Sequence, residues 1–275
     1  SAWNNGVTVV NRVPMELYLK GVVPSEIVPS WKPDAIKAQA VAARTYAVYH
    51  KNGYRSAGYD ITDDTRSQVY RGCSVETSAT NKAVEETAGE IITYNGKAID
   101  ALFHANGGGY TEDSENVWGS YVPYLRGVKE ESSSTINRPW HKIVSIDSFS
   151  NAISRAGYHV GKVKKIGLSR LHMGNNKAKD RGISGRVKTM EITGKSGRKI
   201  IPGEVIQSTF DLDSTLFDIS AKGNNLIITG YGFGHGLGLS QWGAEAMAEK
   251  NGDGKEYYKR ILLHYFTGSK IEKIY

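Results

Sequence analysis

The sequence lacks several features that would place it in a common class of protein. A single cysteine, Cys73, excludes an internal disulfide framework and a zinc site built from several cysteines. No apolar run approaches the roughly 18–20 residues of a transmembrane helix, and the first residues do not form a signal-peptide pattern. Because Ser1 is not an initiator methionine, we expect a processed or truncated chain whose anchor or export signal lies outside it.

Motifs for nucleotide binding are also missing. The stretch TGYGFGHGLGLSQWGAEAMA (229–248) has glycine at every second position from 230 to 238. A dinucleotide-binding fingerprint would need glycine at 237 or 239, where the chain has leucine. A Walker-type loop would need glycine in place of Thr189, five residues before the Gly-Lys-Ser tripeptide. Glycine costs conformational entropy, so we expect something large or flat to lie against this loop.

The chain does carry an excess of positive charge. Its 35 lysines and arginines against 28 aspartates and glutamates give a net charge of +7, which favours an anionic partner. Basic residues gather in VGKVKKIGLSR (160–170). A solvated face, a nucleic acid and a polyanionic cell-wall polymer all fit this charge, but the sequence contains no recognised nucleic-acid module.

Helix and strand signals predict an α+β fold, with helices packed on mixed or antiparallel sheets. A short helix is expected from Pro14 to a stop at Gly21, and a longer one over 33–50 with an alanine-lined face. EIITYNGKAIDALFHA predicts a hairpin that turns at Asn95-Gly96. Its alternation puts His104 on the face opposite Phe103. Further helices are expected over 75–88, 148–156, 204–210, 240–249 and 256–266.

Three residue types could carry chemistry. Glu26 is the only charged residue of GVVPSEIVPSW (21–31), and apolar surroundings raise the pKa of a carboxyl group, as a general acid requires. His104 and His235 each stand beside several glycines. A zinc site needs three or four converging ligands, and the chain has neither HExxH nor a cysteine pair, so no metal or other cofactor is expected. Cys73 is expected to be a small packing residue.

Six motifs in order resemble one known family. They are YLKGVVPSE, AIKAQAVAARTYA, SQVYRG, FHANGGGYTEDSENVWG, PYLRGV and GYGFGHGLGLSQWGAEAMA. Together they resemble the stage II sporulation protein D family, which includes the amidase enhancers. The resemblance runs over nearly the whole chain and is weakest between about 140 and 210. It implies one catalytic unit over 1–275 with a basic insertion lobe at about 140–210, and two lobes flanking a glycan-binding cleft.

The resemblance implies a peptidoglycan lytic transglycosylase that acts on glycan strands stripped of stem peptides. The family's catalytic glutamate maps onto Glu26. Some members carry a Cys/His zinc cluster before the QVY motif, whereas YDITDDTRSQVY here has no cysteine or histidine. Expected glycan contacts are His104, Asn106, Gly107, Gly108, His235, Gly236, Ser240 and Gln241, with Gln39, Arg44, Gln68 and Tyr70 in support.

The resemblance also implies partners and a location. Members work during engulfment in endospore-forming bacteria, with an amidase-endopeptidase and a membrane scaffold, on the side of the membrane that faces the cell wall. We therefore expect an extracytoplasmic protein anchored by a segment outside this chain, with no nucleic-acid partner. The alternative is a non-catalytic module that binds glycan and enhances a cell-wall amidase.

Overall fold

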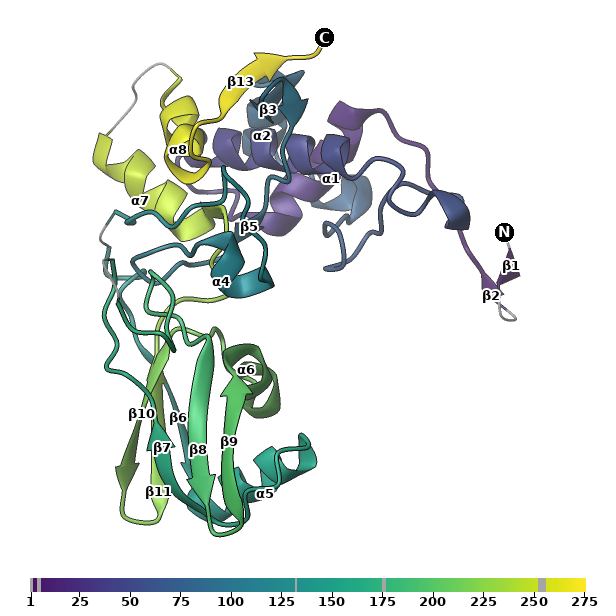
Figure 1. Cartoon of the computed structure of the whole chain (residues 1–275). Helices are drawn as coiled ribbons and strands as arrows, with labels where there is room; N and C mark the ends of the chain where they lie inside the picture. Colours follow the sequence, from purple (N-terminus) through teal and green to yellow (C-terminus); the bar gives the residue numbers. More distant parts are fainter. Residues whose placement is uncertain (1, 4–5, 132, 175–176, 252–255) are drawn as a thin grey trace. The chain divides into compact units, whose positions relative to one another are not determined.

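The computed structural model describes residues 2–3, 6–131, 133–174, 177–251 and 256–275. Helices and small sheets alternate along the chain, which confirms the predicted α+β class (Figure 1). The chain divides into two compact units. The first comprises Ser1–Leu102 with Met247–Tyr275, and the second comprises Phe103–Ala246. None of the described helices is long and apolar enough to cross a membrane.

Helix α2 (Pro33–Tyr49) is the centre of the first unit. Proline at its first position suits a helix start, because that backbone nitrogen has no intrahelical acceptor. Helices α1 (Met15–Glu26), α3 (Ser78–Glu86) and α8 (Tyr257–Tyr265) all pack against it, as does strand β3 (Glu90–Tyr94). The small side chains of α2 are therefore buried on every face, beyond the single alanine-lined face predicted. The buried residues include Ala35, Ile36, Ala38, Ala40, Val41, Ala42, Ala43 and Ala47.

Helix α1 continues past its predicted end. The expected stop at Gly21 is wrong, since the helix runs through Gly21 and Pro24 to Glu26. A Cβ atom on Gly21 would lie only 2.6 Å from the ring of Tyr70. Glycine at this position therefore allows close packing and does not end the helix.

The predicted hairpin is present only next to its turn, because its second strand ends at Ala98 and Phe103–His104 form a separate strand, and a third strand completes the sheet. Asn95 and Gly96 have φ angles of 51° and 73°, as a type I′ turn requires. The turn connects β3 to the short strand β4 (Lys97–Ala98), and β13 (Lys270–Lys273) pairs with the other edge of β3. The remaining short elements of this unit are β1 (Ala2–Trp3), β2 (Gly6–Val7), η1 (Arg55–Ala57) and η2 (Gly72–Val75).

Two three-stranded antiparallel sheets form most of the second unit. One has the order β10-β11-β6 and the other β7-β8-β9. Their strands are β6 (Trp140–Ser145), β7 (Val163–Gly167), β8 (Thr189–Gly194), β9 (Gly197–Pro202), β10 (Phe217–Lys222) and β11 (Asn225–Gly230). Helices α5 (Ile146–Arg155) and α6 (Gly203–Phe210) contribute to one apolar core, in which the rings of Phe149 and Phe210 stack 4.6 Å apart. The region 140–210 thus supplies four of these strands and both helices.

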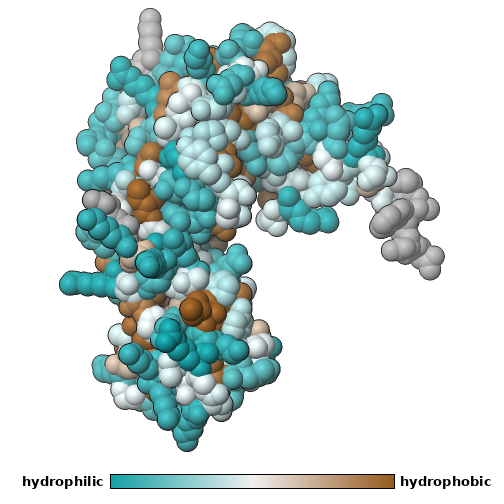
Figure 2. All heavy atoms as spheres, viewed as in Figure 1, coloured by the Kyte–Doolittle hydropathy of each residue, from teal (hydrophilic) through white to brown (hydrophobic). Residues whose placement is uncertain are grey.

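The functional motifs lie on the shorter elements. These are β5 (Phe103–His104), α4 (Ser114–Trp118), β12 (Leu239–Ser240) and α7 (Gln241–Asn251). Helix α4 was not predicted from the sequence. On the face drawn in Figure 2, hydrophobic side chains occur as small separate groups among hydrophilic ones.

Candidate functional site

Glu26 is the last residue of α1 and is half-buried in the first unit. The backbone N–H of Val69 donates a hydrogen bond to its Oε1 over 2.8 Å. Burial raises the pKa of Glu26, although the Val69 N–H opposes this rise. The carboxyl end of a helix also carries partial negative charge, which disfavours an ionised carboxylate there. The raised pKa expected from the apolar sequence context is confirmed.

The segment around Gln68 holds this N–H in position. The Gln68 side chain is buried, and its Nε2 donates to the carbonyl oxygen of Ala43 over 3.2 Å. Its Oε1 accepts a hydrogen bond from the Tyr18 hydroxyl over 3.1 Å. On the other side of Val69, the Arg71 N–H donates to the carbonyl of Gly21. The buried Gln68 side chain therefore holds the backbone next to Val69 in place. This favours a positioning role for Gln68 over the direct glycan contact predicted for it.

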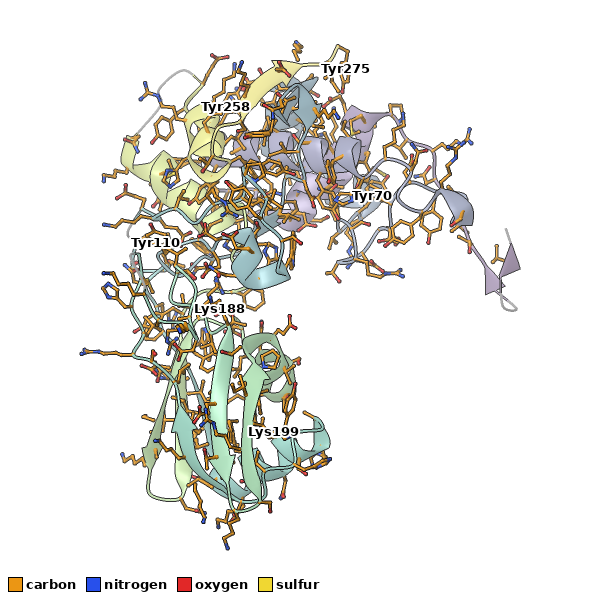
Figure 3. All side chains as sticks on the ribbon, viewed as in Figure 1. Tyr70, Tyr110, Lys188, Lys199, Tyr258 and Tyr275 are labelled. Carbon is orange, nitrogen blue, oxygen red and sulfur yellow. The ribbon has the colours of Figure 1, made fainter. Side chains whose placement is uncertain are left out.

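Tyrosines define the neighbourhood of Glu26. The rings of Tyr18 and Tyr70 stack with centroids 5.4 Å apart, and Tyr70 is labelled in Figure 3. Burial raises the pKa of Tyr18, and the negative charge of Glu26 adds to the effect. Burial likewise raises the pKa of Tyr46, with smaller contributions that include Asp100 and Glu26. Tyr70 was predicted as a site residue, whereas Tyr18 and Tyr46 were missed.

Arg44 and Gln39 lie in the core of the first unit. Both are fully buried. The Arg44 guanidinium donates to both carboxylate oxygens of Glu16, over 2.8 and 2.6 Å, and to the carbonyl of Glu90. Glu16 also accepts from the hydroxyl of Tyr275, which Figure 3 labels. This burial favours a structural role over the glycan contact predicted for the two residues.

In the second unit a strand pairing joins two sequence motifs. Strands β5 and β12 are parallel, with Ser240 opposite His104. The Ser240 hydroxyl accepts hydrogen bonds from the Gly107 and Gly243 N–H groups, both over 3.2 Å. Residues from FHANGGG and GHGLGLSQW, more than a hundred positions apart in the chain, therefore form one cluster.

His104 and His235 stand side by side in this cluster, with ring centroids 5.3 Å apart. His104 Nδ1 lies 3.0 Å from the carbonyl oxygen of Leu237, so this nitrogen carries a proton. His235 Nε2 donates to the carbonyl of Phe103, and its Nδ1 accepts from the Leu237 N–H. Burial lowers the pKa of His104 well below its usual range, and the positive charge of Arg186 reinforces this. His104 is therefore neutral at neutral pH.

The alternating glycines are required by packing inside the protein. Gly232, Gly234 and Gly236 have φ angles of 70°, 102° and 83°, in the left-handed region. A Cβ atom at these positions would lie 2.7 Å from Asn106 O, 2.9 Å from His104 Cβ and 2.2 Å from Arg186 Nε, respectively. The flat partner expected for this loop is thus, at these three glycines, the protein's own backbone and buried side chains.

Buried charged groups that sequence reasoning missed support both glycine-rich segments, 107–109 and 232–236. Arg186 donates to the carbonyls of Gly107 and Gly234, both over 3.2 Å. Burial lowers its pKa to about 10, against the attraction of Glu112 and Glu130. The Glu130 carboxylate accepts from the Gly109 N–H over 2.7 Å. No local pattern in the sequence distinguishes these charges from those of a solvated surface.

Most of the predicted glycan contacts are themselves buried. The exposed fractions of His104, Asn106, Ser240 and Gln241 are 4%, 8%, 0% and 8%. Their side chains shape the loops, and His235 with the neighbouring Phe233 is more open to solvent. This burial favours a role for His104, Asn106, Ser240 and Gln241 in holding the loops in position, over the direct glycan contact predicted for them.

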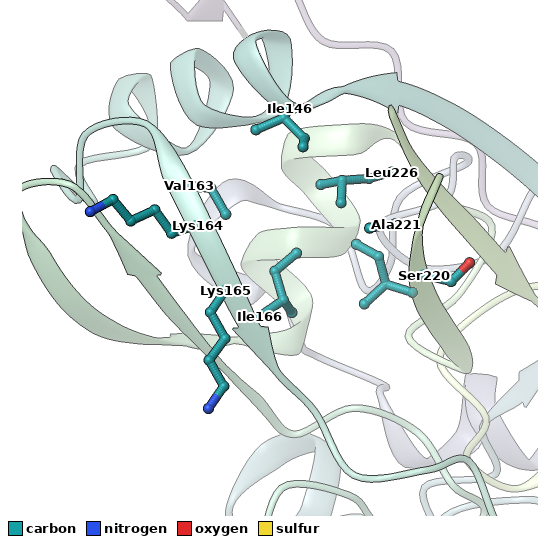
Figure 4. A pocket seen from close by; sticks show the side chains of 9 residues that line it. Ile146, Val163, Lys164, Lys165, Ile166, Ser220, Ala221 and Leu226 are labelled. Atoms are coloured by element: carbon teal, nitrogen blue, oxygen red, sulfur yellow. The ribbon is translucent and has the colours of Figure 1, made fainter. Parts of the chain in front are cut away.

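The basic segment 160–170 includes strand β7. Lys164 and Lys165 are exposed on this strand, beside a groove of about 160 Å³ whose apolar lining includes Ile166, Ile219 and Leu226 (Figure 4). Within the described ranges, these two lysines form no ion pair, whereas Lys162 pairs with Asp147 over 2.7 Å.

Two further expectations concern cysteine and metal. Cys73 is an exposed free thiol in the 3₁₀ turn η2, so its predicted packing role is wrong. None of the residues of this turn is buried. Among the residues that the structure describes, no group of three or more His, Cys, Asp or Glu side chains could hold a metal ion.

Comparison with known proteins identifies the family. Residues 3–94 match the family described as Stage II sporulation protein, and residues 127–238 match a domain of unknown function. The chain is 36% identical over 98% of its length to an uncharacterised protein of Brachyspira hyodysenteriae, of which it covers 69%. It is 33% identical over 96% of its length to stage II sporulation protein D of Bacillus subtilis, of which it covers 76%.

A third relative is the amidase enhancer of Bacillus subtilis. The identity is 30% over 92% of this chain, which spans 40% of that longer protein. The chain belongs to the stage II sporulation protein D family, as its six ordered motifs indicated.

Proposed function

We propose that the protein is a lytic transglycosylase that cleaves the bond between N-acetylmuramic acid and N-acetylglucosamine in peptidoglycan strands without stem peptides. The observation that carries this proposal is the environment of Glu26. Its carboxyl group is half-buried, its pKa is raised, and Val69 holds it by one hydrogen bond. A carboxyl group whose pKa is raised retains its proton to higher pH, which suits general acid catalysis.

In the proposed reaction Glu26 acts twice. Its protonated carboxyl first donates to the oxygen that links muramic acid C1 to N-acetylglucosamine, and the C1–O bond breaks. The carboxylate then removes the proton from the C6 hydroxyl of the same muramic acid. The C6 oxygen bonds to C1 and closes a 1,6-anhydro ring, which restores the protonated glutamic acid. No water is consumed.

This reaction needs only one carboxyl group, whereas hydrolysis by glycosidases commonly uses two. Burial raises the pKa of Glu26, and the Val69 N–H limits this rise. Such an environment suits a group that alternates between acid and base in one site. Tyr18, Tyr46 and Tyr70 would border the bound sugar, and Gln68 would keep the Val69 N–H aimed at Glu26.

In the second unit, the loop that contains His235 would bind the strand. The buried Arg186 donates to the carbonyl of Gly234 in this loop, and Glu130 holds the neighbouring glycine segment through the Gly109 N–H. A fixed loop binds without first losing conformational freedom, which favours affinity.

The family relationship supports a role at the cell wall during sporulation, in cooperation with an amidase. A protein with this substrate would work on the extracytoplasmic side of a membrane, where an anchor outside the present chain could hold it. We further propose that the region 1–275 acts as one catalytic unit.

The test is to incubate the protein with stripped glycan strands and identify the products by mass spectrometry. The expected products end in 1,6-anhydro-N-acetylmuramic acid. Reducing ends that carry oxygen from labelled water would instead indicate hydrolysis. Binding without cleavage would indicate the amidase-enhancer function, and preference for DNA or RNA would overturn both.

A further inference from the structure

A short helix in the second unit presents a large aromatic side chain to solvent. Trp118, the last residue of α4, is 50% exposed, and Tyr121 in the following turn is 67% exposed. Half-exposed tryptophan gains only part of the stabilisation that full burial would provide. Fold stability therefore does not explain an indole at this position.

The helix that carries Trp118 is held by several hydrogen bonds. The buried carboxylate of Glu112 accepts from Asn116 Nδ2 over 2.8 Å. The guanidinium of Arg126 donates to both carboxylate oxygens of Glu115, over 2.9 and 2.6 Å. Ser114 Oγ donates to the carbonyl of Ser120 and accepts from the Val122 N–H, both over 2.8 Å. A helix of five residues is not stable alone, so these bonds keep its position.

Trp118 also stands next to the glycine-rich loop. Its ring centroid lies 6.3 Å from that of His235, at an interplanar angle of 38°. Both ring nitrogens of His235 bond to backbone groups of this unit, which fixes the imidazole. Trp118 is therefore a rigid aromatic surface beside the loop that most clearly distinguishes this sequence.

Charged groups of both signs surround α4. Arg126 pairs with Glu115 and lies 3.5 Å from Asp113. Lys188, labelled in Figure 3, donates to Asn116 Oδ1 over 3.3 Å. The carboxylates of Glu112, Asp113 and Glu115 and two basic side chains thus surround the helix. These surroundings carry no excess of positive charge, so they favour an uncharged polar ligand over an anionic one.

We propose that Trp118 is a stacking subsite for an uncharged N-acetylated sugar ring of a glycan strand. One face of such a ring presents C–H groups, which pack on the electron-rich face of an indole. The sugar hydroxyls at the ring edge can donate to Asp113 or Glu115. In a peptidoglycan strand this ring is N-acetylglucosamine, because muramic acid carries a lactyl carboxylate. The inference rests on the proposed function, since it takes glycan as the ligand.

The test measures binding in the Glu26→Gln background, which prevents cleavage. The probes are a chitin oligomer and a stripped glycan strand of equal length, with affinity measured by calorimetry over a range of salt concentrations. Trp118→Ala should weaken binding of both probes about tenfold, as truncation of an aromatic side chain that becomes buried on binding does. The dependence on salt should not change. Ile200→Ala, which removes an exposed apolar side chain from β9, is the control and should have no effect.

Two further variants distinguish the loss of aromatic stacking from a general disturbance of the fold. Trp118→Phe keeps an aromatic face and should bind within about threefold of the parent protein, whereas Trp118→Leu should bind as weakly as Trp118→Ala. Equal affinity of the parent and Trp118→Leu would overturn the inference and leave the proposed function intact. A loss confined to the stripped strand would also overturn it, because the subsite would then recognise charge. If the parent protein binds neither probe, the proposed function itself fails.

Discussion

At the residue scale, burial and not a charged partner sets the direction of the pKa shift of Glu26. Basic partners lower the pKa of Asp64, Glu86 and Glu115. Burial raises the pKa of Glu26 and also that of Glu130. Glu130 is only 4% exposed and is bound to a glycine N–H, so a polymer cannot reach it. Glu26 combines a raised pKa with an accessible position.

This environment should make Glu26→Gln increasingly stabilising as pH rises. A carboxyl group with a raised folded-state pKa contributes its full stability below the unfolded pKa, about 4.3 for glutamate. That contribution is lost as pH rises through the folded-state pKa. Glutamine stays neutral, so its contribution to the free energy of unfolding does not change with pH. The difference in unfolding midpoint between variant and wild type, measured in urea from about pH 4 to pH 8, should therefore grow with pH.

Asp60→Asn, at an exposed carboxylate in the same unit, is the control for general effects of charge. A difference for Glu26→Gln that stays constant or shrinks with rising pH would contradict a raised pKa.

Some site residues could be predicted from the sequence and others could not. Glu26 stands out because it is the one charge in an apolar segment. Tyr18 was missed because the helix was expected to end at Gly21. The spacing of 18, 22 and 26 on a continuous helix would have placed Tyr18 on the face of Glu26. Arg186 and Glu130 could not be found, because only tertiary packing shows that a charge is buried.

At the element scale, the glycine-rich loop depends on close internal contacts as well as on left-handed backbone. Gly236 combines a φ of 83° with the guanidinium of Arg186 directly beyond its missing side chain. Gly223, in the turn between β10 and β11, has a φ of 59° and open space around it. A comparison of the two positions therefore distinguishes the cost of backbone strain from the cost of a packing clash.

Gly236→Ala should therefore destabilise the protein more than Gly223→Ala. The left-handed backbone alone costs about 1–2 kcal/mol for alanine. At Gly236 the clash with Arg186 should add about 1–3 kcal/mol, the usual cost of overpacking. Chemical denaturation of both variants measures the difference. Equal losses would mean that Arg186 moves away freely and that the loop is not held by it.

Local elements were predictable where one short-range signal dominates. Helix α2 and the Asn95-Gly96 turn match their predictions because proline, alanine spacing and positive φ act within a few residues. The end of α1 was mispredicted because glycine at position 21 makes room for the ring of Tyr70, which is distant in sequence. The parallel pairing of β5 with β12 joins residues over 130 positions apart, and no local pattern specifies it.

At the scale of the whole molecule, the net charge of +7 is consistent with a polyanionic substrate. Stripped strands carry a lactyl carboxylate on each muramic acid. Lys164 and Lys165 are exposed and, in the described part of the chain, form no ion pair. They are therefore available to attract carboxylates.

The affinity for stripped strands should fall more steeply with salt than the affinity for a chitin oligomer of equal length. Coulomb attraction at an exposed site is screened over about 8–10 Å at physiological salt and about 3 Å at 1 M. Replacing Lys164 and Lys165 by glutamate should flatten the salt dependence without altering the pH profile of cleavage. If both ligands respond equally to salt, the basic strand does not contact glycan, and steric exclusion of stem peptides must provide the selectivity.

The most direct test of the central claim compares wild type with Glu26→Gln on stripped strands. Glutamine keeps the shape of the side chain and can still accept the Val69 hydrogen bond, but it has no transferable proton. The rate at which 1,6-anhydro ends appear, followed by mass spectrometry, should fall by a factor of about 10²–10⁴, while the affinity for the strand is retained. Cleavage by the variant at a rate near that of wild type would show that Glu26 is not the acid.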